Sequence, residues 1–456
     1  MRNVIDGRRC RKCEGSEKQL SRDYGIKEAK MKKVMGAIIL SVLVLVVPSV
    51  MVACAPAEEA STPAVPVEEK VVKIGLITDL SGPTSPTISP IAEGLFDRMN
   101  YINEKGIEYQ DPKTGKTEKV RIEILIGDTR GEKPAAISLY KRHREAGIVV
   151  AFNMESTTGL ALWGLTIEDK IPSLNFGGAF DIIDPRGWTY GGTPTQNQQF
   201  GLFLQWAVKN WKEPRPMRLA ILYHDIPWSM AVIQPQALDY AKKLGVDVVW
   251  KGAVSVFPLD TTPQLTAISE AKADWVYMTV IQPPAAVVMK DADRIGVKLG
   301  FATGTGTYSE EIITLAGELA EGYIGMVGLA MPVEEDTIPE IKVSRQLLEK
   351  NHPGKVLTVN SVTGHFGAVL VTHIVSVALE KFGYPLTGSQ VREAITTIKH
   401  YDCEGLQPGL VSWGPGDTWD DHCAIEQSRL GIVKEGKMIP LTDWTPVPME
   451  IMAELK

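Results

Sequence analysis

Short apolar runs alternate with amphipathic stretches along most of the chain after residue 70. The apolar runs predict buried strands at 72–78, 120–126, 148–152, 171–175, 218–223, 247–250 and 275–279. Helical spacing of apolar positions predicts helices at 91–102, 134–146, 158–169, 198–210, 231–244 and 262–271. Strand and helix alternating in this way are typical of parallel sheets covered by helices on both faces. We therefore expect an α/β fold.

The predicted strands are followed by loops of similar composition. Most of these loops are rich in Gly, Ser, Thr, Pro and aromatic residues, and they lie at 79–89, 153–158, 175–180, 224–230, 280–285 and 303–308. Any one of them can be explained by turn chemistry alone. In open parallel sheets, however, ligands bind outside the carboxyl ends of the strands, where all six loops should meet. The pattern predicts a small-molecule site there, with Phe152, Phe176, Phe180, Trp228 and Tyr308 as candidates either for its walls or for the core.

The first 70 residues have a different character. Lys32 and Lys33 precede an almost purely apolar stretch at 34–53, and Cys54 follows directly. A basic start, an apolar stretch and small residues before a cut are typical of an export signal, and the cysteine makes it resemble a bacterial lipoprotein signal. We expect 1–30 to be an over-extended start, 31–53 a signal peptide, Cys54 a lipidation site and 54–70 a flexible tether. An uncleaved membrane anchor is the alternative.

Charge and motifs exclude several functions. Residues 1–53 hold 11 basic and 5 acidic residues, so the rest of the chain, with 37 basic and 50 acidic residues, is strongly acidic. An acidic body argues against nucleic acid as a partner. The sequence has no HExxH, no Gly-x-Ser-x-Gly and no phosphate-binding Gly-rich loop with Lys, so we expect no metal, no cofactor and no catalysis.

A set of short motifs runs through the body in a fixed order. It comprises Lys73-Ile74-Gly75, Leu80-Ser81-Gly82-Pro83, Gly127-Asp128-Thr129, Ile171-Pro172-Ser173, Leu315-Ala316-Gly317, Ala320-Glu321-Gly322, Ala378-Leu379-Glu380, Asp421-His422 and Asp443-Trp444. With these motifs in this order, the chain resembles the periplasmic solute-binding proteins of the branched-chain amino acid (Leu/Ile/Val) type. The resemblance implies two Rossmann-like lobes that close on a ligand about three hinge crossings, near Gln198, Ala330 and Glu426. It assigns 71–197 plus 330–425 to an N-terminal lobe and 198–329 plus 426–456 to a C-terminal lobe.

The resemblance also implies the ligand-binding positions. Carried over by position, they are Ser81, Ser156, Thr157, Gly177, Ala179, Trp228, Gln282 and Thr305. Ser156 matches a serine that holds the ligand's carboxylate, whereas Ala179 replaces a threonine and Trp228 replaces a tyrosine. Thr305 stands where the family has the acidic partner of the ligand's α-amino group. Because a buried ammonium needs a countercharge, a carboxylate- or amide-bearing solute fits better than an amino acid, unless Asp225 or Glu155 substitutes.

Two cysteines near the C-terminus, Cys403 and Cys423, bracket a loop of nineteen residues. In an oxidising compartment a disulfide between them would stabilise the fold by about 3 kcal/mol, and two reduced thiols are the alternative.

These expectations combine into one function. The chain is expected to be a lipid-anchored, extracytoplasmic, monomeric solute-binding protein that delivers a small molecule to the permease of an ABC importer. The same fold also serves ligand-sensing receptors, which is the alternative reading, and an exported enzyme is a third.

Overall fold

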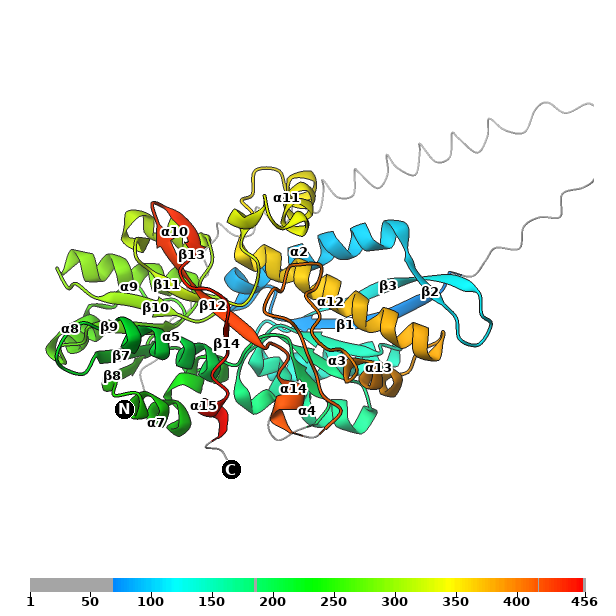
Figure 1. Cartoon of the computed structure of the whole chain (residues 1–456), viewed down its shortest axis with the longest axis horizontal. Coiled ribbons are helices and arrows are strands. Elements are labelled where there is room, and N and C mark those ends of the chain that lie inside the picture. Colours follow the sequence, from blue (N-terminus) through cyan, green and yellow to red (C-terminus); the bar gives the residue numbers. More distant parts are fainter. Residues whose placement is uncertain (1–68, 184–186, 417, 454–456) are drawn as a thin grey trace, which may run out of the picture. The chain divides into compact units, whose positions relative to one another are not determined.

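The computed structural model describes residues 69–183, 187–416 and 418–453 (Figure 1). The predicted start, the signal peptide, the lipidation site at Cys54 and nearly all of the predicted tether lie outside these residues.

The first half of the body is built on a six-stranded sheet with the order β2-β3-β1-β4-β5-β6. Its strands are β1 (Val71–Thr78), β2 (Ile107–Gln110), β3 (Thr117–Asp128), β4 (Val150–Asn153), β5 (Ser173–Asn175) and β6 (Thr189–Gly191). All neighbours pair in parallel except β2 and β3, which are antiparallel. The central strand β1 is buried from Ile74 to Thr78, as the continuous apolar run predicts for a parallel strand covered on both faces. The helices α2 (Ser85–Lys105), α3 (Lys133–Glu145) and α4 (Ser156–Asp169) connect these strands.

A second sheet has eight strands in the order β13-β12-β11-β10-β9-β7-β8, with β14 paired to β12. They are β7 (Arg218–Tyr223), β8 (Asp247–Ala253), β9 (Trp275–Thr279), β10 (Gly300–Thr303), β11 (Ile324–Val327), β12 (Gln427–Lys434), β13 (Lys437–Pro440) and β14 (Thr445–Pro446). β7 to β11 pair in parallel, and the late strand β12 adds to β11 antiparallel. The helices α5 (Gln196–Asn210), α7 (Pro235–Lys243), α8 (Thr262–Glu270), α9 (Gln282–Arg294) and α10 (Glu311–Ala316) belong to this half. The expected α/β fold with two helix-covered, mostly parallel sheets is confirmed.

The chain passes between the two sheets three times: after β6, after β11 and before β12. Between the second and third passages it forms α11 (Pro339–Asn351), α12 (Val359–Phe382) and α13 (Gly388–Ile395) on the side of the six-stranded sheet (Figure 1). The division into two lobes with boundaries at 198, 330 and 426 stays a prediction.

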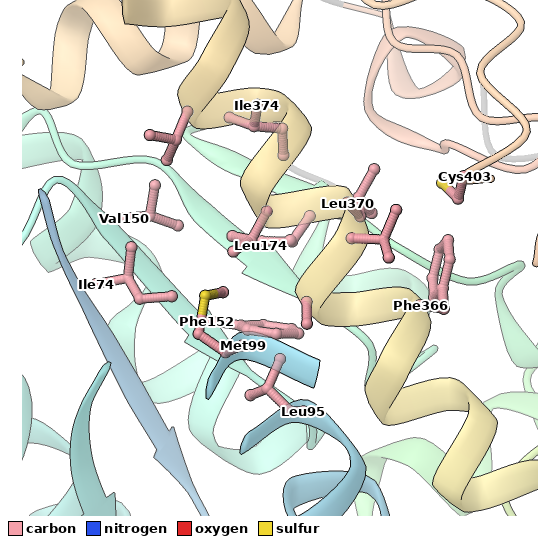
Figure 2. Packing of buried hydrophobic residues seen from close by; sticks show 14 of the residues in the cluster. Ile74, Leu95, Met99, Val150, Phe152, Leu174, Phe366, Leu370, Ile374 and Cys403 are labelled. Atoms are coloured by element: carbon pink, nitrogen blue, oxygen red, sulfur yellow. The ribbon is translucent and has the colours of Figure 1, made fainter. Parts of the chain in front are cut away.

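Helix α12 is the centre of the core of the first half. Phe366, Leu370 and Ile374 project from it toward Phe152 and Leu174 of the sheet and toward helix α2 (Figure 2). The two helices can approach closely because residue 364 is a glycine without a side chain. A Cβ at this position would lie only 2.0 Å from the Ile91 carbonyl oxygen. Among the described helices α12 alone is long and apolar enough to cross a membrane, but 72% of its most apolar window is buried inside the protein, as expected of a core helix.

The expected disulfide is wrong for this structure. Cys403 and Cys423 are both buried and are not bonded to each other. Cys403 packs in the cluster around α12 (Figure 2), whereas Cys423 packs in a different cluster, with Phe180 of the first half and with Phe200 and other residues of the second half. The two sulfurs are buried in separate apolar environments, so the short loop between them does not bring them together.

Candidate ligand cavity

A cavity of about 180 Å³ lies where the strands of both sheets have their carboxyl ends. Its lining comes from the loops after β1, β3, β4, β5 and β6 on one side, and from those after β7, β8, β9, β10 and β11 on the other. The start of α12 and the loop segments around Gln407 and Ile425 complete the wall. This is the position that the strand-end rule predicts for a ligand site.

Most of the wall is apolar. The residues that provide it are Pro83, Ile88, Ile91, Met154, Phe176, Pro194, Ile226, Trp228, Val256, Ile281, Leu329, Val359 and Ile425. Phe176 is held in place by Phe366, with ring centroids 5.3 Å apart, and by the edge of Phe152. Of the five aromatic candidates from the sequence, Phe176 and Trp228 line the cavity, whereas Phe152, Phe180 and Tyr308 belong to the core.

One corner of the cavity is formed by the first turn of α4. The Ser156 hydroxyl donates to the Gly177 carbonyl oxygen at 2.9 Å and accepts from the Ala179 N–H at 3.1 Å, which ties the loop after β5 to the helix. A Cβ at Gly177 would lie 2.4 Å from the Ser156 nitrogen, so only glycine allows this approach. The first N–H groups of a helix have no partner within it and attract negative or partly negative groups. Ser156, Thr157 and Gly177 therefore present a polar corner suited to a carboxylate or carbonyl oxygen.

Two carboxylates, Asp79 and Glu155, are the only charged side chains that line the cavity within the described residues. Glu155 accepts hydrogen bonds from the Asp79 N–H at 2.7 Å and from the hydroxyls of Thr78, Thr129 and Thr158. Burial raises the pKa of the Glu155 carboxyl, and these hydrogen bonds oppose the rise.

Asp79 is bonded in a similar way. Its carboxylate accepts from the N–H groups of Gly82 and Thr84, at 2.5 and 2.9 Å, and from the Thr84 hydroxyl at 2.8 Å. Glu155 thus joins the ends of β1, β3 and α4, whereas Asp79 holds the loop between β1 and α2, and the oxygens of both acids are already engaged within the protein.

On the opposite wall Thr305 lines the cavity, as expected. Its N–H and hydroxyl both contact the Gln199 Oε1 atom, at 2.7 and 3.2 Å. Asp225 is exposed and does not line the cavity, so it is not a substitute for the missing acidic residue. Glu155, the other candidate substitute, makes the four hydrogen bonds described above.

Three of the eight predicted ligand positions are not part of the lining. The Ser81 hydroxyl donates to Asp128 at 2.5 Å and joins the loops after β1 and β3. Ala179 lies behind Ser156, to which its N–H is bonded. Gln282 accepts from the Thr87 hydroxyl at 2.7 Å and donates to the Gly306 carbonyl at 2.5 Å, so it connects α9 to α2. The other five, Ser156, Thr157, Gly177, Trp228 and Thr305, are brought together around the cavity.

The lining residues that follow β11 were not predicted from the sequence. Val359, Asn360 and Thr363 come from the first turns of α12, and Gln407 comes from an irregular loop. The strand-end rule does not apply to these segments, because none of them directly follows a strand. The only signal in the sequence was the polar Asn360 at the start of an otherwise apolar helix.

Two mostly parallel sheets with a cavity at their strand ends, lined from both sides, form the arrangement expected of a solute-binding fold. Residues 71–437 match the periplasmic binding protein family, and the chain belongs to that family. Its members and structural neighbours are solute-binding proteins rather than enzymes.

Individual relatives are distant. The Leu/Ile/Val-binding protein homolog 1 of Brucella suis biovar 1 (strain 1330) is 20% identical over 260 residues, which cover 56% of this chain and 67% of the relative. A branched-chain amino acid ABC transporter protein from Thermus thermophilus, solved with bound valine, has a TM-score of 0.74 at 22% identity and covers 85% of this chain and 99% of its own. A fatty acid ABC transporter substrate-binding protein from Thermomonospora curvata has a TM-score of 0.71 at 18% identity, and the match covers 84% of this chain and 94% of that protein.

Proposed function

We propose that this chain binds a small solute with an apolar body and a carboxylate or amide head, and delivers it to the permease of an ABC importer. The observation that carries the proposal is the cavity wall, which is largely apolar and whose two carboxylates are both engaged within the protein. The head group would lie at the first turn of α4, against Ser156, Thr157 and Gly177. The body would lie against the apolar wall that includes Phe176 and Trp228.

The same wall argues against a zwitterionic amino acid. A buried ammonium without a countercharge is costly by several kcal/mol, and Thr305 supplies no charge. Solutes in this fold differ widely, since the two structural neighbours above are named for a branched-chain amino acid and for a fatty acid. The fold alone therefore does not determine which solute binds, and the residues that line the cavity do.

The proposal is tested with three solutes of the same body. Leucine, 4-methylpentanoate and 4-methylpentanamide share one branched chain and differ in the α-amino group and the head. In calorimetric titrations of the purified protein, we expect the acid or the amide to bind at least about 10-fold more tightly than leucine. Tighter binding of leucine would contradict the proposal. Loss of uptake of the preferred solute when the gene is deleted tests the transport step.

Extracytoplasmic location and a lipid anchor on Cys54 are part of the same proposal. They are supported by the lipoprotein-like segment at 31–54 and by membership of a family that is typically periplasmic. A protein held at the outer face of the membrane by lipid chains would meet its permease without diffusing away.

A further inference from the structure

Gln407 lies in the irregular loop between α13 and β12. Its own N–H donates to the Asp402 carbonyl at 2.9 Å, and its carbonyl accepts from the Leu410 N–H at 3.0 Å. The preceding residue, Leu406, accepts from the Ala330 N–H at 2.9 Å. The backbone of Gln407 is therefore fixed beside the segment that leaves β11, on a different part of the cavity wall from α4.

Gln407 is one of the residues that line the cavity and is 0% exposed, yet neither its Nε2 nor its Oε1 atom has a hydrogen-bond partner within the protein. Other buried glutamines near the cavity use both ends of the amide. Gln199 donates to the Pro194 carbonyl and accepts from Thr305, and Gln282 bridges Thr87 and Gly306. Gln196 also lacks side-chain partners, but it does not line the cavity.

A buried amide with neither donor nor acceptor satisfied destabilises a fold unless something binds it. Gln407 has such an unpaired amide at the wall of a ligand cavity, where a polar group of the bound solute can form the missing hydrogen bonds. We propose that Gln407 is a ligand-binding residue and that the solute carries a second, uncharged polar group, a hydroxyl or a carboxamide, besides its head at α4. This inference rests on the proposed function and narrows its solute class to two-ended molecules with an apolar body.

The chemistry of the amide sets the class of this second group. Nε2 donates and Oε1 accepts, so the best partner offers both an acceptor and a donor, as hydroxyl and carboxamide groups do. No Lys, Arg or His side chain lines the cavity within the described residues, so nothing there would compensate a second negative charge. One such neutral hydrogen bond corresponds to a gain in affinity of about 3- to 10-fold.

The test compares parent acids with their hydroxylated partners. The probes are straight-chain alkanoates of four to eight carbons, each paired with its ω-hydroxy derivative. Benzoate is added and paired with its 3-hydroxy and 4-hydroxy derivatives. They are titrated into the full-length wild-type protein and into Gln407→Met, which keeps the length of the side chain but removes both polar atoms. We expect at least one hydroxylated probe to bind wild type several-fold more tightly than its parent, and we expect that preference to fall to within about 2-fold in Gln407→Met.

A second readout needs no ligand. Without solute, Gln407→Met should raise the Tm by about 1 °C or more, because it removes an unsatisfied buried amide. The matched control is Gln198→Met. Gln198 is equally buried, lies outside the cavity and makes the capping contacts of α5 with Thr195, so this change should lower the Tm and leave the preference intact.

The possible failures are distinguishable. The inference is overturned if wild type prefers no hydroxylated probe, if the preference survives in Gln407→Met, or if that variant loses stability without ligand. If neither the parent acids nor any of the proposed acids and amides bind wild type, the proposed function fails and the inference fails with it.

Discussion

Glu310 joins the two halves of the body and should make their stability depend on pH. It lies between β10 and α10, and its Oε2 atom accepts from the Val359 N–H at 2.8 Å, at the first residue of α12. The neighbouring Ser309 hydroxyl contacts the Asn360 N–H at 3.4 Å. Since α12 packs on α2 in the first half, this bond links the eight-stranded sheet to the other half.

Burial raises the pKa of the Glu310 carboxyl from 4.5 to about 7, and Glu311 adds to the rise, while the bond from Val359 and the charge of Arg345 oppose it. The folded protein thus binds this proton more tightly than the unfolded chain. The resulting stabilisation is full below pH 4.5 and is lost as the pH rises through about 7. A pKa difference of about 2.5 corresponds to about 3 kcal/mol. For a body of roughly 390 residues this is a change in Tm of about 4 °C.

The assay is thermal unfolding between pH 5 and 8.5 for wild type, Glu310→Gln and the control Glu318→Gln, whose side chain is exposed. We expect the Tm of wild type and of the control to fall relative to that of Glu310→Gln as the pH rises over this range, by up to about 4 °C. Burial also raises the pKa values of Glu155 and Glu340, which contribute in the same direction. Burial lowers the pKa values of His143, His224, His365 and His373, which contribute in the opposite direction below about pH 6.5. All of these groups remain in the three proteins, so the difference isolates Glu310. Parallel curves for wild type and Glu310→Gln would refute the reasoning.

Three further predictions concern the site, the core and the anchor. Thr305→Glu restores a carboxylate to the cavity wall and should improve the affinity for leucine relative to 4-methylpentanoate by about 10-fold in titrations, and an unchanged ratio would contradict the position given to Thr305. Gly364→Ala places a Cβ against the Ile91 carbonyl and should cost about 2–3 kcal/mol in urea unfolding, whereas Gly164→Ala, with open space around it, should be neutral or stabilising. Cys54→Ala should move the protein from the detergent phase to the aqueous phase in phase partitioning, and retention in the detergent phase would indicate an uncleaved anchor.

The sequence predicted the strands of the six-stranded sheet best where they are long and buried. The run at 72–78 favours a strand, because a short, mostly apolar stretch bounded by turn residues suits a strand covered on both faces. The strands after residue 279, β10 to β14, were not predicted, and the short strands β2 and β6 were also missed. β2 alternates buried and exposed residues over only four positions at a sheet edge, and β6 is three residues long, so neither gives a period to detect.

The site was predictable as far as the strand-end rule reaches. That rule located the loops that carry Ser156, Gly177, Trp228 and Thr305, because parallel strands end at one edge whatever their side chains are. It could not find Gln407, which depends on how a long irregular loop folds back beside β11. The wrong disulfide has a similar origin, since the separation of two cysteines along the chain does not say which apolar cluster each will join.

Glu155 shows why residue type and position together still leave the ligand open. From the sequence it was, with Asp225, one of two candidate countercharges for an amino group. In the structure three hydroxyls and one backbone N–H converge on its carboxylate and join β1, β3 and α4. A ligand ammonium there would compete with bonds that hold the corner together, and the polar corner would lose the geometry that suits a head group. The hydrogen-bond partners of Glu155, more than its charge, therefore favour a solute without an ammonium group.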